Sequence, residues 1–241
     1  MPRSFTVSKI NALGDRLRHA AHPTESDLQM LQQVRLDYDP ALYKVQQLLR
    51  SQLGLQVTSR LKTVGTIVDK LKRERTRLSR MQDIAGVRIV TDMTLTEQDA
   101  QVASIQGRFP GSEVIDRRER PSYGYRAVHV IVTVDGCPVE IQVRTQKQDR
   151  WAQILEKIAD DWGRQIRYGG EPTDPEALVG QRSRREALEM IMNVSTLIAQ
   201  NEILTEKHSA LIAQGASVEE LAPLVQTLSA QVDDLLARLL E

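Results

Sequence analysis

The stretch "MQDIAGVRIV" (residues 81–90) decides the fold, because it sets one carboxylate, Asp83, directly before an apolar run. Val87, Ile89 and Val90 predict a buried β-strand. Asp83 is then either an N-cap that begins a turn or a metal ligand at the rim of a sheet. A partner carboxylate, a source of positive charge and a surface for base stacking would favour the metal ligand.

The composition indicates a folded protein without a strong overall field. The chain has 241 residues, of which 41% are hydrophobic and 4% aromatic, and its formal net charge is zero. A packed core is therefore expected, and any anion must bind through a local patch. The single cysteine, Cys137, excludes an intramolecular disulfide framework and a zinc cluster of cysteines. Without a signal-peptide apolar region or an apolar run of about 18 residues, we expect a cytoplasmic protein that binds no membrane.

Hydrophobic periodicity and turn residues predict an α+β protein with a mixed β-sheet flanked by helices. Helices are expected within residues 4–54, with a start signal at Thr24 and a second start at Pro40, and at 66–77, 94–109, 147–166, 181–205 and 217–240. Strands are expected at residues 55–63, 85–92, 112–120, 126–134 and 137–145, with Asp135-Gly136 as a hairpin turn. The predicted domains are N-terminal helices at 1–54, a core at 55–168 and a C-terminal helical extension at 169–241.

A second carboxylate lies on the strand at residues 137–145. Glu140, Gln142 and Arg144 share one face of this strand, because side chains alternate between faces. This row is either a solvated surface or part of a site. Two carboxylates from neighbouring strands, Asp83 and Glu140, would suit Mg²⁺, which prefers a few hard oxygen ligands.

Basic residues precede Asp83. Arg60 and Lys62 share a strand face, and a continued helix would place four more cations on one face. These four are Lys70, Arg73, Arg77 and Arg80. The cluster favours an anion such as a triphosphate or RNA, and the alternative is a solvated helix face. No P-loop motif is present, so side chains would have to hold the phosphates.

The stretch "RPSYGYRAVHVIV" (residues 120–132) gathers aromatic residues before a strand. Tyr125 and His129 point the same way from the sheet, and a tyrosine there is able to stack on a purine. The alternative is that both are ordinary strand residues with polar tips.

A stripe of apolar residues runs along the last predicted helix. Its members are Leu221, Leu224, Leu228, Val232, Leu235 and Leu239. The spacing is typical of a coiled-coil seam, so the stripe forms either a homo-oligomer contact or a packing face within the chain.

Taken in order, six blocks resemble the synthetase domain of the RelA/SpoT family, which makes the alarmones ppGpp and pppGpp. The blocks are "SRLK", "IVDKLKR", "MQDIAGVRIV", "GYRAVH", "VEIQVRT" and "WAQILEKI", and they span about residues 55–160. The resemblance implies a nucleotidyltransferase-like sheet and transfer of pyrophosphate from ATP to the ribose 3′-oxygen of GDP or GTP. AMP would be released and Mg²⁺ would be required.

The resemblance also implies roles for individual residues. Asp83 and Glu140 would be catalytic and would bind Mg²⁺, with Glu140 either assisting the metal or taking the 3′-hydroxyl proton. ATP would bind to Arg60, Lys62, Lys70, Arg73 and Arg88. The acceptor nucleotide would bind to Tyr125, Arg126, His129, Gln142, Arg144 and Asp149.

The sequence departs from the family in ways that keep alternatives open. No His-Asp dipeptide of the hydrolase domain occurs, so a small single-domain synthetase is expected. Asp149 stands where many members have Asn, and Tyr123 and Pro121 replace other residues before "GYR". A toxin of the same fold acting on tRNA or adenine nucleotides, with an antitoxin partner, is one alternative. A non-catalytic nucleotide-binding regulator is another.

Overall fold

The computed structural model describes residues 4–219 and 221–239, and the chain divides into two compact units. The first unit comprises Met1–Ile89, Val102–Ile115 and His129–Val143, and the second comprises Val90–Gln101, Asp116–Val128 and Arg144–Glu241. Each unit is assembled from three separate segments. The sequence-based division into 1–54, 55–168 and 169–241 stays a prediction.

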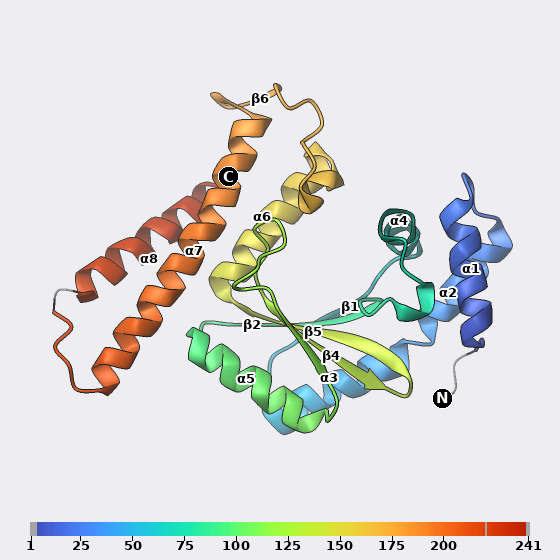
Figure 1. Ribbon diagram of the computed structural model, residues 1–241, viewed down its shortest axis with the longest axis horizontal. Coiled ribbons are helices and arrows are strands. Elements are labelled where there is room, and N and C mark those ends of the chain that lie inside the picture. The colour runs from blue at the N-terminus through green and yellow to red at the C-terminus, as the bar shows by residue number, and fades with distance from the viewer. Residues whose placement is uncertain (1–3, 220, 240–241) are drawn as a thin grey trace. The chain divides into compact units, whose positions relative to one another are not determined.

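A five-stranded mixed sheet forms the centre of the first unit, apart from some strand ends that are counted in the second (Figure 1). The spatial order is β1 (Thr58–Leu61), β2 (Ala85–Thr91), β5 (Cys137–Thr145), β4 (Val128–Val134) and β3 (Glu113–Asp116). Residues alternate between buried and partly exposed along β2 and along β5 as far as Val143. The predicted α+β fold with a mixed sheet flanked by helices is confirmed.

The Asp135-Gly136 turn between β4 and β5 is also confirmed. Both residues have positive φ, 51° for Asp135 and 76° for Gly136. Two consecutive residues of this kind match the twist of a two-residue hairpin, and Gly adopts the conformation without steric cost.

The N-terminal helices pack within the first unit. They are α1 (Val7–His19), α2 (Glu25–Leu36), α3 (Asp39–Leu53), α4 (Val64–Glu74) and the 3₁₀ turn η1 (Leu78–Arg80). Thr24 caps α2 and Pro40 lies in the first turn of α3, as the sequence predicts. Helix α1 packs against α2, α4 and η1, and α3 packs against β1. The helical part of this core includes Leu13, Leu17, Leu31, Leu49, Ile67, Leu71 and Leu78.

Helix α4 differs from the predicted helix at residues 66–77. It begins earlier because the Thr63 side chain accepts a hydrogen bond from the backbone N–H of Thr66. It ends at Glu74 because Arg75 adopts a left-handed conformation with φ 49°. Arg77 and Arg80 therefore follow the helix, and the prediction that they share a helix face with Lys70 and Arg73 is wrong.

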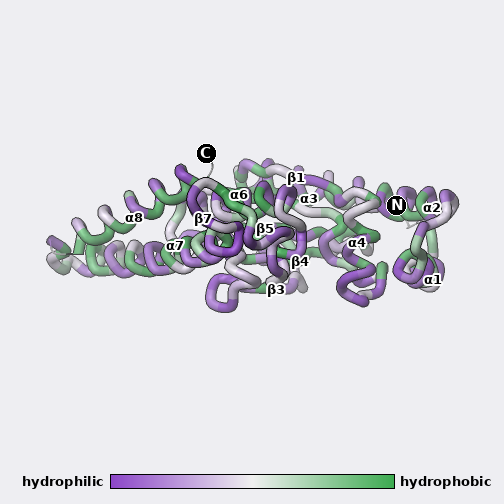
Figure 2. Tube along the Cα trace, turned by 90° about the horizontal axis from the view of Figure 1, so that it is seen from above, coloured by the Kyte–Doolittle hydropathy of each residue, from purple (hydrophilic) through white to green (hydrophobic). Residues whose placement is uncertain are grey.

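Four helical segments dominate the second unit. Helix α6 (Gln146–Trp162) is followed by η2 (Arg164–Tyr168), the short β6 (Leu178–Val179) and β7 (Arg182–Ser183), α7 (Arg184–Ala213) and α8 (Leu221–Arg238). Helix α5 (Leu95–Arg108) begins in the second unit and ends in the first. Figure 1 shows α7 and α8 side by side, and Figure 2 shows apolar and polar turns alternating along both. None of the helices in the described ranges is long and apolar enough to cross a membrane.

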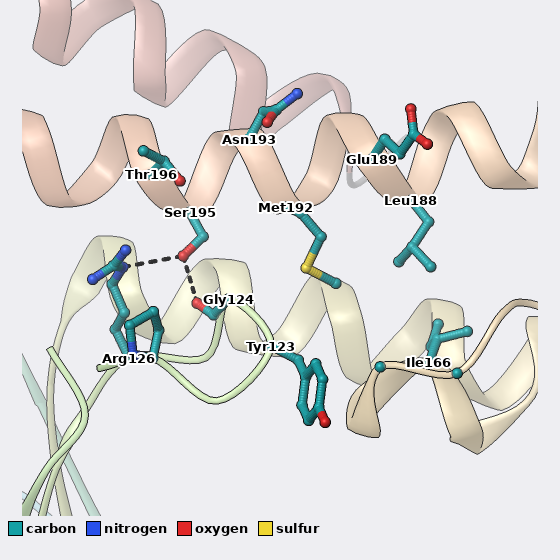
Figure 3. Close-up of a pocket in the computed structure, with 13 residues that line it drawn as sticks. Tyr123, Gly124, Arg126, Ile166, Leu188, Glu189, Met192, Asn193, Ser195 and Thr196 are labelled. Atoms are coloured by element: carbon teal, nitrogen blue, oxygen red, sulfur yellow. Dashed lines mark hydrogen bonds between the residues drawn. The ribbon is translucent and has the colours of Figure 1, made fainter. Parts of the chain in front are cut away.

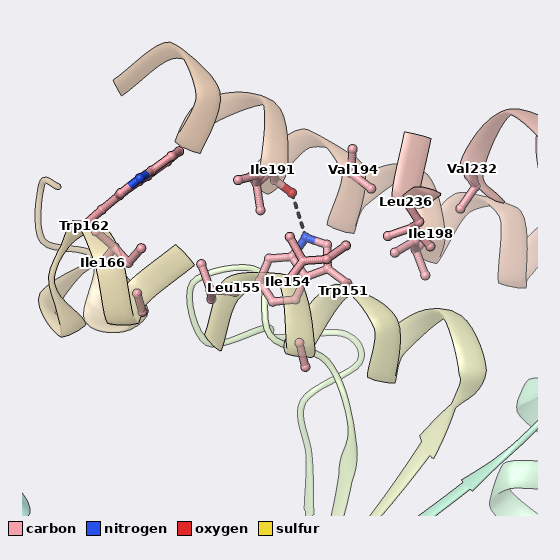
Figure 4. Packing of buried hydrophobic residues seen from close by; sticks show 12 residues of the cluster. Trp151, Ile154, Leu155, Trp162, Ile166, Ile191, Val194, Ile198, Val232 and Leu236 are labelled. Carbon is pink, nitrogen blue, oxygen red and sulfur yellow. Dashed lines mark hydrogen bonds between the residues drawn. The ribbon is translucent and has the colours of Figure 1, made fainter. Parts of the chain in front are cut away.

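Trp151 is the centre of the apolar core of the second unit (Figure 4). It is 1% exposed, and its indole Nε1 donates to the Ile191 carbonyl oxygen at 2.7 Å. The bond satisfies the one polar atom of the buried indole ring, which offsets the cost of removing that N–H from water. Trp151 thereby connects α6 to α7.

Helix α8 packs against α7 and α6 of its own chain. Its buried residues are Val225, Val232 and Leu236, whereas Leu224 is 55% exposed. Leu224 is therefore not on the packing face, which corrects the predicted stripe. The predicted homo-oligomer contact stays a prediction, and residues 220 and 240 of the predicted helix lie outside the described ranges.

Replacement of Gly14 by Ala tests the packing of α1 on η1. Alanine is normally the better helix residue, but a Cβ at position 14 would lie 2.8 Å from the Leu78 Cβ. We expect Gly14→Ala to lower the free energy of unfolding by about 1–3 kcal/mol. The matched control is Gly107→Ala in α5, which has open space around it and should gain about 0.5–1 kcal/mol. Equal gains in thermal unfolding for both variants would contradict the close packing.

Candidate active site

Asp83 lies between η1 and β2 and is paired with two lysines of the first unit. Its Oδ2 is 2.6 Å from Lys70 Nζ and 3.3 Å from Lys62 Nζ. Burial alone would lower the pKa of Lys70, but the charge and hydrogen bond of Asp83, together with Glu74, raise that pKa above its usual value. Lys70 therefore carries positive charge beside Asp83 at neutral pH.

The second carboxylate oxygen of Asp83 is the exception to this pairing. Asp83 Oδ1 is buried, and no described residue donates a hydrogen bond to it. A buried oxygen of this kind is costly unless it meets a cation or a donor. Asp83 thus has one oxygen paired with protein cations and one buried oxygen without a hydrogen-bond donor among the described residues.

Glu140 lies on β5, the strand next to β2, and is held by two neighbours. His129 Nδ1 of β4 is 2.9 Å from Glu140 Oε1, and Gln142 Nε2 donates to Oε2 at 2.7 Å. Burial would raise the pKa of Glu140, but the hydrogen bond and charge of His129, the Gln142 bond and the charge of Lys62 outweigh it. The pKa falls to about 2. Glu140 is therefore an anion across the physiological pH range.

Lys62 links the two carboxylates electrostatically, because it pairs with Asp83 and also lowers the pKa of Glu140. Within residues 4–219 and 221–239, no three His, Cys, Asp or Glu side chains cluster to form a metal site of protein ligands alone. Mg²⁺ usually takes only one or two carboxylates and completes its shell with water and phosphate oxygens. The pair Asp83 and Glu140, with the open Oδ1, fits that pattern.

The remaining predicted ATP-binding residues lie around β1, α4 and β2. Arg60 lies on β1 opposite Gly86, and Arg88 lies on the partly exposed face of β2. Arg73 Nη2 donates to Glu74 at 2.8 Å on the exposed side of α4. The first unit thus carries five predicted cations on or beside β1, α4 and β2, and two of them contact Asp83.

Three of the predicted acceptor-binding residues form one network in the second unit. Arg144 donates to Tyr125 Oη at 2.9 Å and to Asp149 Oδ1 at 2.8 Å, and its guanidinium lies 4.9 Å from the centre of the Tyr125 ring. Burial would lower the pKa of Arg144, but Tyr125 and Asp149 raise it. Gln153 donates to the other oxygen of Asp149. Both carboxylate oxygens of Asp149 are therefore engaged within the protein.

The loop at residues 117–127, which carries Tyr125 and Arg126, is held by α7. Ser195 accepts a hydrogen bond from Arg126 Nε at 3.2 Å, and its hydroxyl donates to the Gly124 carbonyl oxygen (Figure 3). Arg126 also donates to the Arg118 carbonyl oxygen, so it closes the loop on itself. Arg126, predicted to bind the acceptor, is thus a structural clamp in this conformation.

Sequence reasoning missed Ser195 and Glu202 as residues that build this region. Glu202 accepts hydrogen bonds from the Thr145 hydroxyl and from Gln148, which form the capping box of α6. Burial raises the pKa of Glu202. Both residues lie mid-helix in α7 without a motif, so no local sequence signal identifies them.

Three comparisons place these features among known proteins. Residues 59–161 match the family described as the region found in RelA / SpoT proteins. The chain is 39% identical over 151 residues to the uncharacterized protein Rv1366 of Mycobacterium tuberculosis, and the match covers 61% of this chain and 55% of that relative. The chain thus spans about half the length of the curated relative that it matches.

The fold is that of the small alarmone synthetases. The crystal structure of small alarmone synthetase 1 from Bacillus subtilis has a TM-score of 0.51 at 20% identity, covering 79% of this chain and 97% of that chain. The same enzyme bound to its product pppGpp has a TM-score of 0.50 at 22% identity, covering 78% and 97%. Residues 59–161 therefore match the region found in RelA / SpoT proteins, as the six sequence blocks predict.

The hydrogen bonds of Glu140 predict that the free energy of unfolding falls at acid pH. Its folded pKa of about 2 lies below the ordinary value of 4.5, so ionised Glu140 stabilises the fold fully above pH 4.5 and progressively less as pH falls toward 2. We expect the difference in unfolding free energy between the wild type and Glu140→Gln to shrink over that window, by at most about 3 kcal/mol. Urea titrations at pH 6, 4 and 3 measure it. Parallel pH profiles for the two proteins would exclude this account of Glu140.

Ser195→Ala tests the clamp on the loop. The change leaves the Gly124 carbonyl and Arg126 Nε without their partner, at a cost of about 1–3 kcal/mol. We expect faster amide hydrogen exchange at residues 117–127, with little change in exchange within the first unit. Thr196→Ala, one residue further along α7 and exposed, is the control. If both variants exchange as the wild type does, Ser195 does not hold the loop.

Proposed function

We propose that the chain is a (p)ppGpp synthetase that transfers the β,γ-pyrophosphate of ATP to the ribose 3′-oxygen of GDP or GTP and releases AMP. The observation that carries the proposal is the carboxylate of Asp83, with one oxygen bound by Lys62 and Lys70 and the other buried without a hydrogen-bond donor among the described residues. Glu140 lies on β5, the strand that pairs with β2, and β2 begins two residues after Asp83. Carboxylates beside cations are the arrangement that phosphoryl transfer requires, because the reaction depends on positioning and charge neutralisation.

In this proposal, Asp83 and Glu140 hold Mg²⁺. The ion would neutralise charge on the ATP phosphates and orient them for in-line attack. Lys62 and Lys70 already lie beside Asp83, and they would pair with phosphate oxygens once ATP arrives. Arg60, Arg73 and Arg88 would hold the rest of ATP, by stacking on adenine or pairing with phosphate.

The proposed reaction forms one bond to phosphorus and breaks another. The ribose 3′-oxygen forms a bond to the β-phosphorus of ATP, the bond from that phosphorus to the oxygen bridging to the α-phosphate breaks, and AMP leaves with that oxygen. The 3′-hydroxyl proton passes to solvent water. With a pKa of about 2, Glu140 is a weak base, which favours the role of metal ligand over that of proton acceptor.

The acceptor is the second substrate of the proposed reaction. Small alarmone synthetase 1, whose fold this chain shares, has been crystallised with its product pppGpp. This supports a guanine nucleotide as the acceptor proposed here. Tyr125, Arg126, His129, Gln142, Arg144 and Asp149 remain the residues proposed to receive it from the resemblance.

Incubation of the purified protein with ATP, Mg²⁺ and a panel of acceptors tests the proposal. The panel comprises GMP, GDP, GTP, ATP and tRNA. We expect AMP release together with a 3′-pyrophosphorylated GDP or GTP. Asp83→Asn should lower the rate at least about a hundredfold, because it removes the charge that would hold the metal.

The control variant is Asp92→Asn, an exposed carboxylate nine residues further along the chain, which should keep the wild-type rate. Circular dichroism confirms that both variants fold. Labelled phosphate that appears on tRNA or ATP and not on GDP or GTP would replace the proposed acceptor. Failure to release AMP with every acceptor would refute the proposed activity.

A further inference from the structure

The N-terminal helices α1 and α2 precede the matched region at residues 59–161, yet they contact the segments that carry the two lysines beside Asp83. Helix α1 packs against α2, α4 and η1, and α2 also packs against α4, all within the first unit (Figure 1). Two arginines on these helices add contacts of another kind. Arg18 donates to the carbonyl oxygen next to Lys70, and Arg35 donates to the carbonyl oxygen of Lys62.

Arg18 of α1 spans the turn at which α4 ends. Its Nε donates to the Leu71 carbonyl oxygen at 3.3 Å, and its Nη2 donates to the Thr76 carbonyl oxygen. Leu71 lies in the last turn of α4, where carbonyl groups have no donor within the helix and a cation is favourable. Arg75, between these two carbonyls, has the uncommon φ of 49°. Arg18 thus holds the chain on both sides of an unfavourable turn, directly after Lys70.

Helix α1 also holds η1, the next segment. Asn11 Oδ1 accepts a hydrogen bond from the Ser79 backbone N–H at 3.2 Å. Together with the two bonds of Arg18, the backbone from α4 to η1 is held at three points by one helix. This stretch of backbone connects Lys70 to Asp83, whose Nζ and Oδ2 atoms lie 2.6 Å apart. The geometry of that ion pair therefore depends on a connection that α1 fixes.

Arg35 of α2 makes a similar contact to Lys62. Its Nε donates to the Lys62 carbonyl oxygen at 2.7 Å, and the Lys62 N–H donates to the Ile84 carbonyl oxygen at 2.8 Å. Ile84 directly follows Asp83. The backbone of Lys62 is thus fixed from both sides just beyond the end of β1, and its Nζ lies 3.3 Å from Asp83 Oδ2. Because a lysine side chain is long and flexible, a fixed backbone limits where its amine lies.

Arg16, also on α1, is placed differently. Its guanidinium donates twice to Asp27 Oδ1 of α2, at 3.0 and 2.7 Å. The Arg16 side chain is 51% exposed, against 17% for Arg18. Exposed ion pairs of this kind contribute little to stability. Arg16 thus joins α1 to α2, whereas Arg18 is withdrawn from solvent and joins α1 to the segment that follows Lys70.

We infer that Arg18 and Arg35 are positioning residues, which set Lys70 and Lys62 against Asp83 from helices outside the matched region. The placement of the lysines rests on the contacts above, whereas their use for the phosphates of ATP rests on the proposed function. Phosphoryl transfer depends on such placement, because it proceeds by positioning and charge neutralisation. Helices α1 and α2 are, in this inference, part of the site that binds ATP.

Chemical labelling of lysine amines without ATP or Mg²⁺, read residue by residue by mass spectrometry, tests the placement separately from activity. An amine held against a carboxylate reacts more slowly than a free amine. We expect Arg18→Gln to raise the labelling of Lys70 at least about twofold, as the loss of one ion pair implies. Arg35→Gln should do the same for Lys62. Lys72, which is exposed on α4, is the internal reference.

Two further variants are controls. Arg18→Lys keeps the positive charge but loses the guanidinium fork that reaches two carbonyls, so it should label as Arg18→Gln does, and it replaces that variant if Arg18→Gln does not fold. Arg16→Gln removes a charge from the same helix and should label as the wild type does. Unchanged labelling of Lys62 and Lys70 in folded Arg18 and Arg35 variants overturns the inference. An equal rise at the reference lysine also overturns it, because that rise reports general loosening.

The same variants are assayed for AMP release with GDP or GTP as acceptor. We expect the KM for ATP to rise roughly 2- to 12-fold in Arg18→Gln and in Arg35→Gln, the effect of one hydrogen bond, with the KM for the acceptor unchanged. Arg16→Gln should keep both values. Selective labelling with an unchanged KM for ATP overturns the role of the two arginines in ATP binding. Selective labelling in a protein that releases no AMP with any acceptor refutes the proposed function and leaves the placement of the lysines standing.

Discussion

The pairing of β2 with β5 at the centre of the sheet is the constraint on which the candidate site depends. Both strands bury alternate residues, so each directs its remaining residues to a partly exposed face. Gly86 of β2 lies in van der Waals range of the backbones of Arg60 on β1 and Glu140 on β5. The pairing of the strands thus brings the segment that follows Asp83 beside the strand that carries Glu140. Lys62 pairs with Asp83 and also acts on the charge of Glu140, so the two carboxylates, 57 residues apart in sequence, share one cation.

The two carboxylates differ in how completely their oxygens are paired within the protein. Glu140 has donors on both oxygens, whereas Asp83 has cations on one oxygen and no donor among the described residues on the other. Lys62 acts on both groups. A cluster that served stability alone would satisfy every buried oxygen, because an unpaired polar atom costs free energy. The Asp83 oxygen without a donor is therefore the feature on which the proposed phosphoryl chemistry rests.

In the second unit, side chains of α6 and α7 hold the loop at residues 117–127 in place. Trp151 supports Gly124 from α6, and Ser195 holds Gly124 and Arg126 from α7. Helix α7 begins after the end of the matched RelA/SpoT region at residue 161. A segment outside that region thus sets the geometry of a loop inside it. Helix α7 therefore has a structural role within its own chain.

The sequence by itself determined the features that local chemistry controls. These are the alternation of β5, the Asp135-Gly136 hairpin, the Thr24 cap, and the candidate pair Asp83 and Glu140. Only the tertiary structure decided where α4 ends, that Arg126 closes a loop, and that Tyr123 is more open than Tyr125. Ser195 meets Arg126 and Gly124 across 69 and 71 residues. Contacts over such separations leave no periodic trace in the chain, because they depend on how packed elements bring distant side chains together.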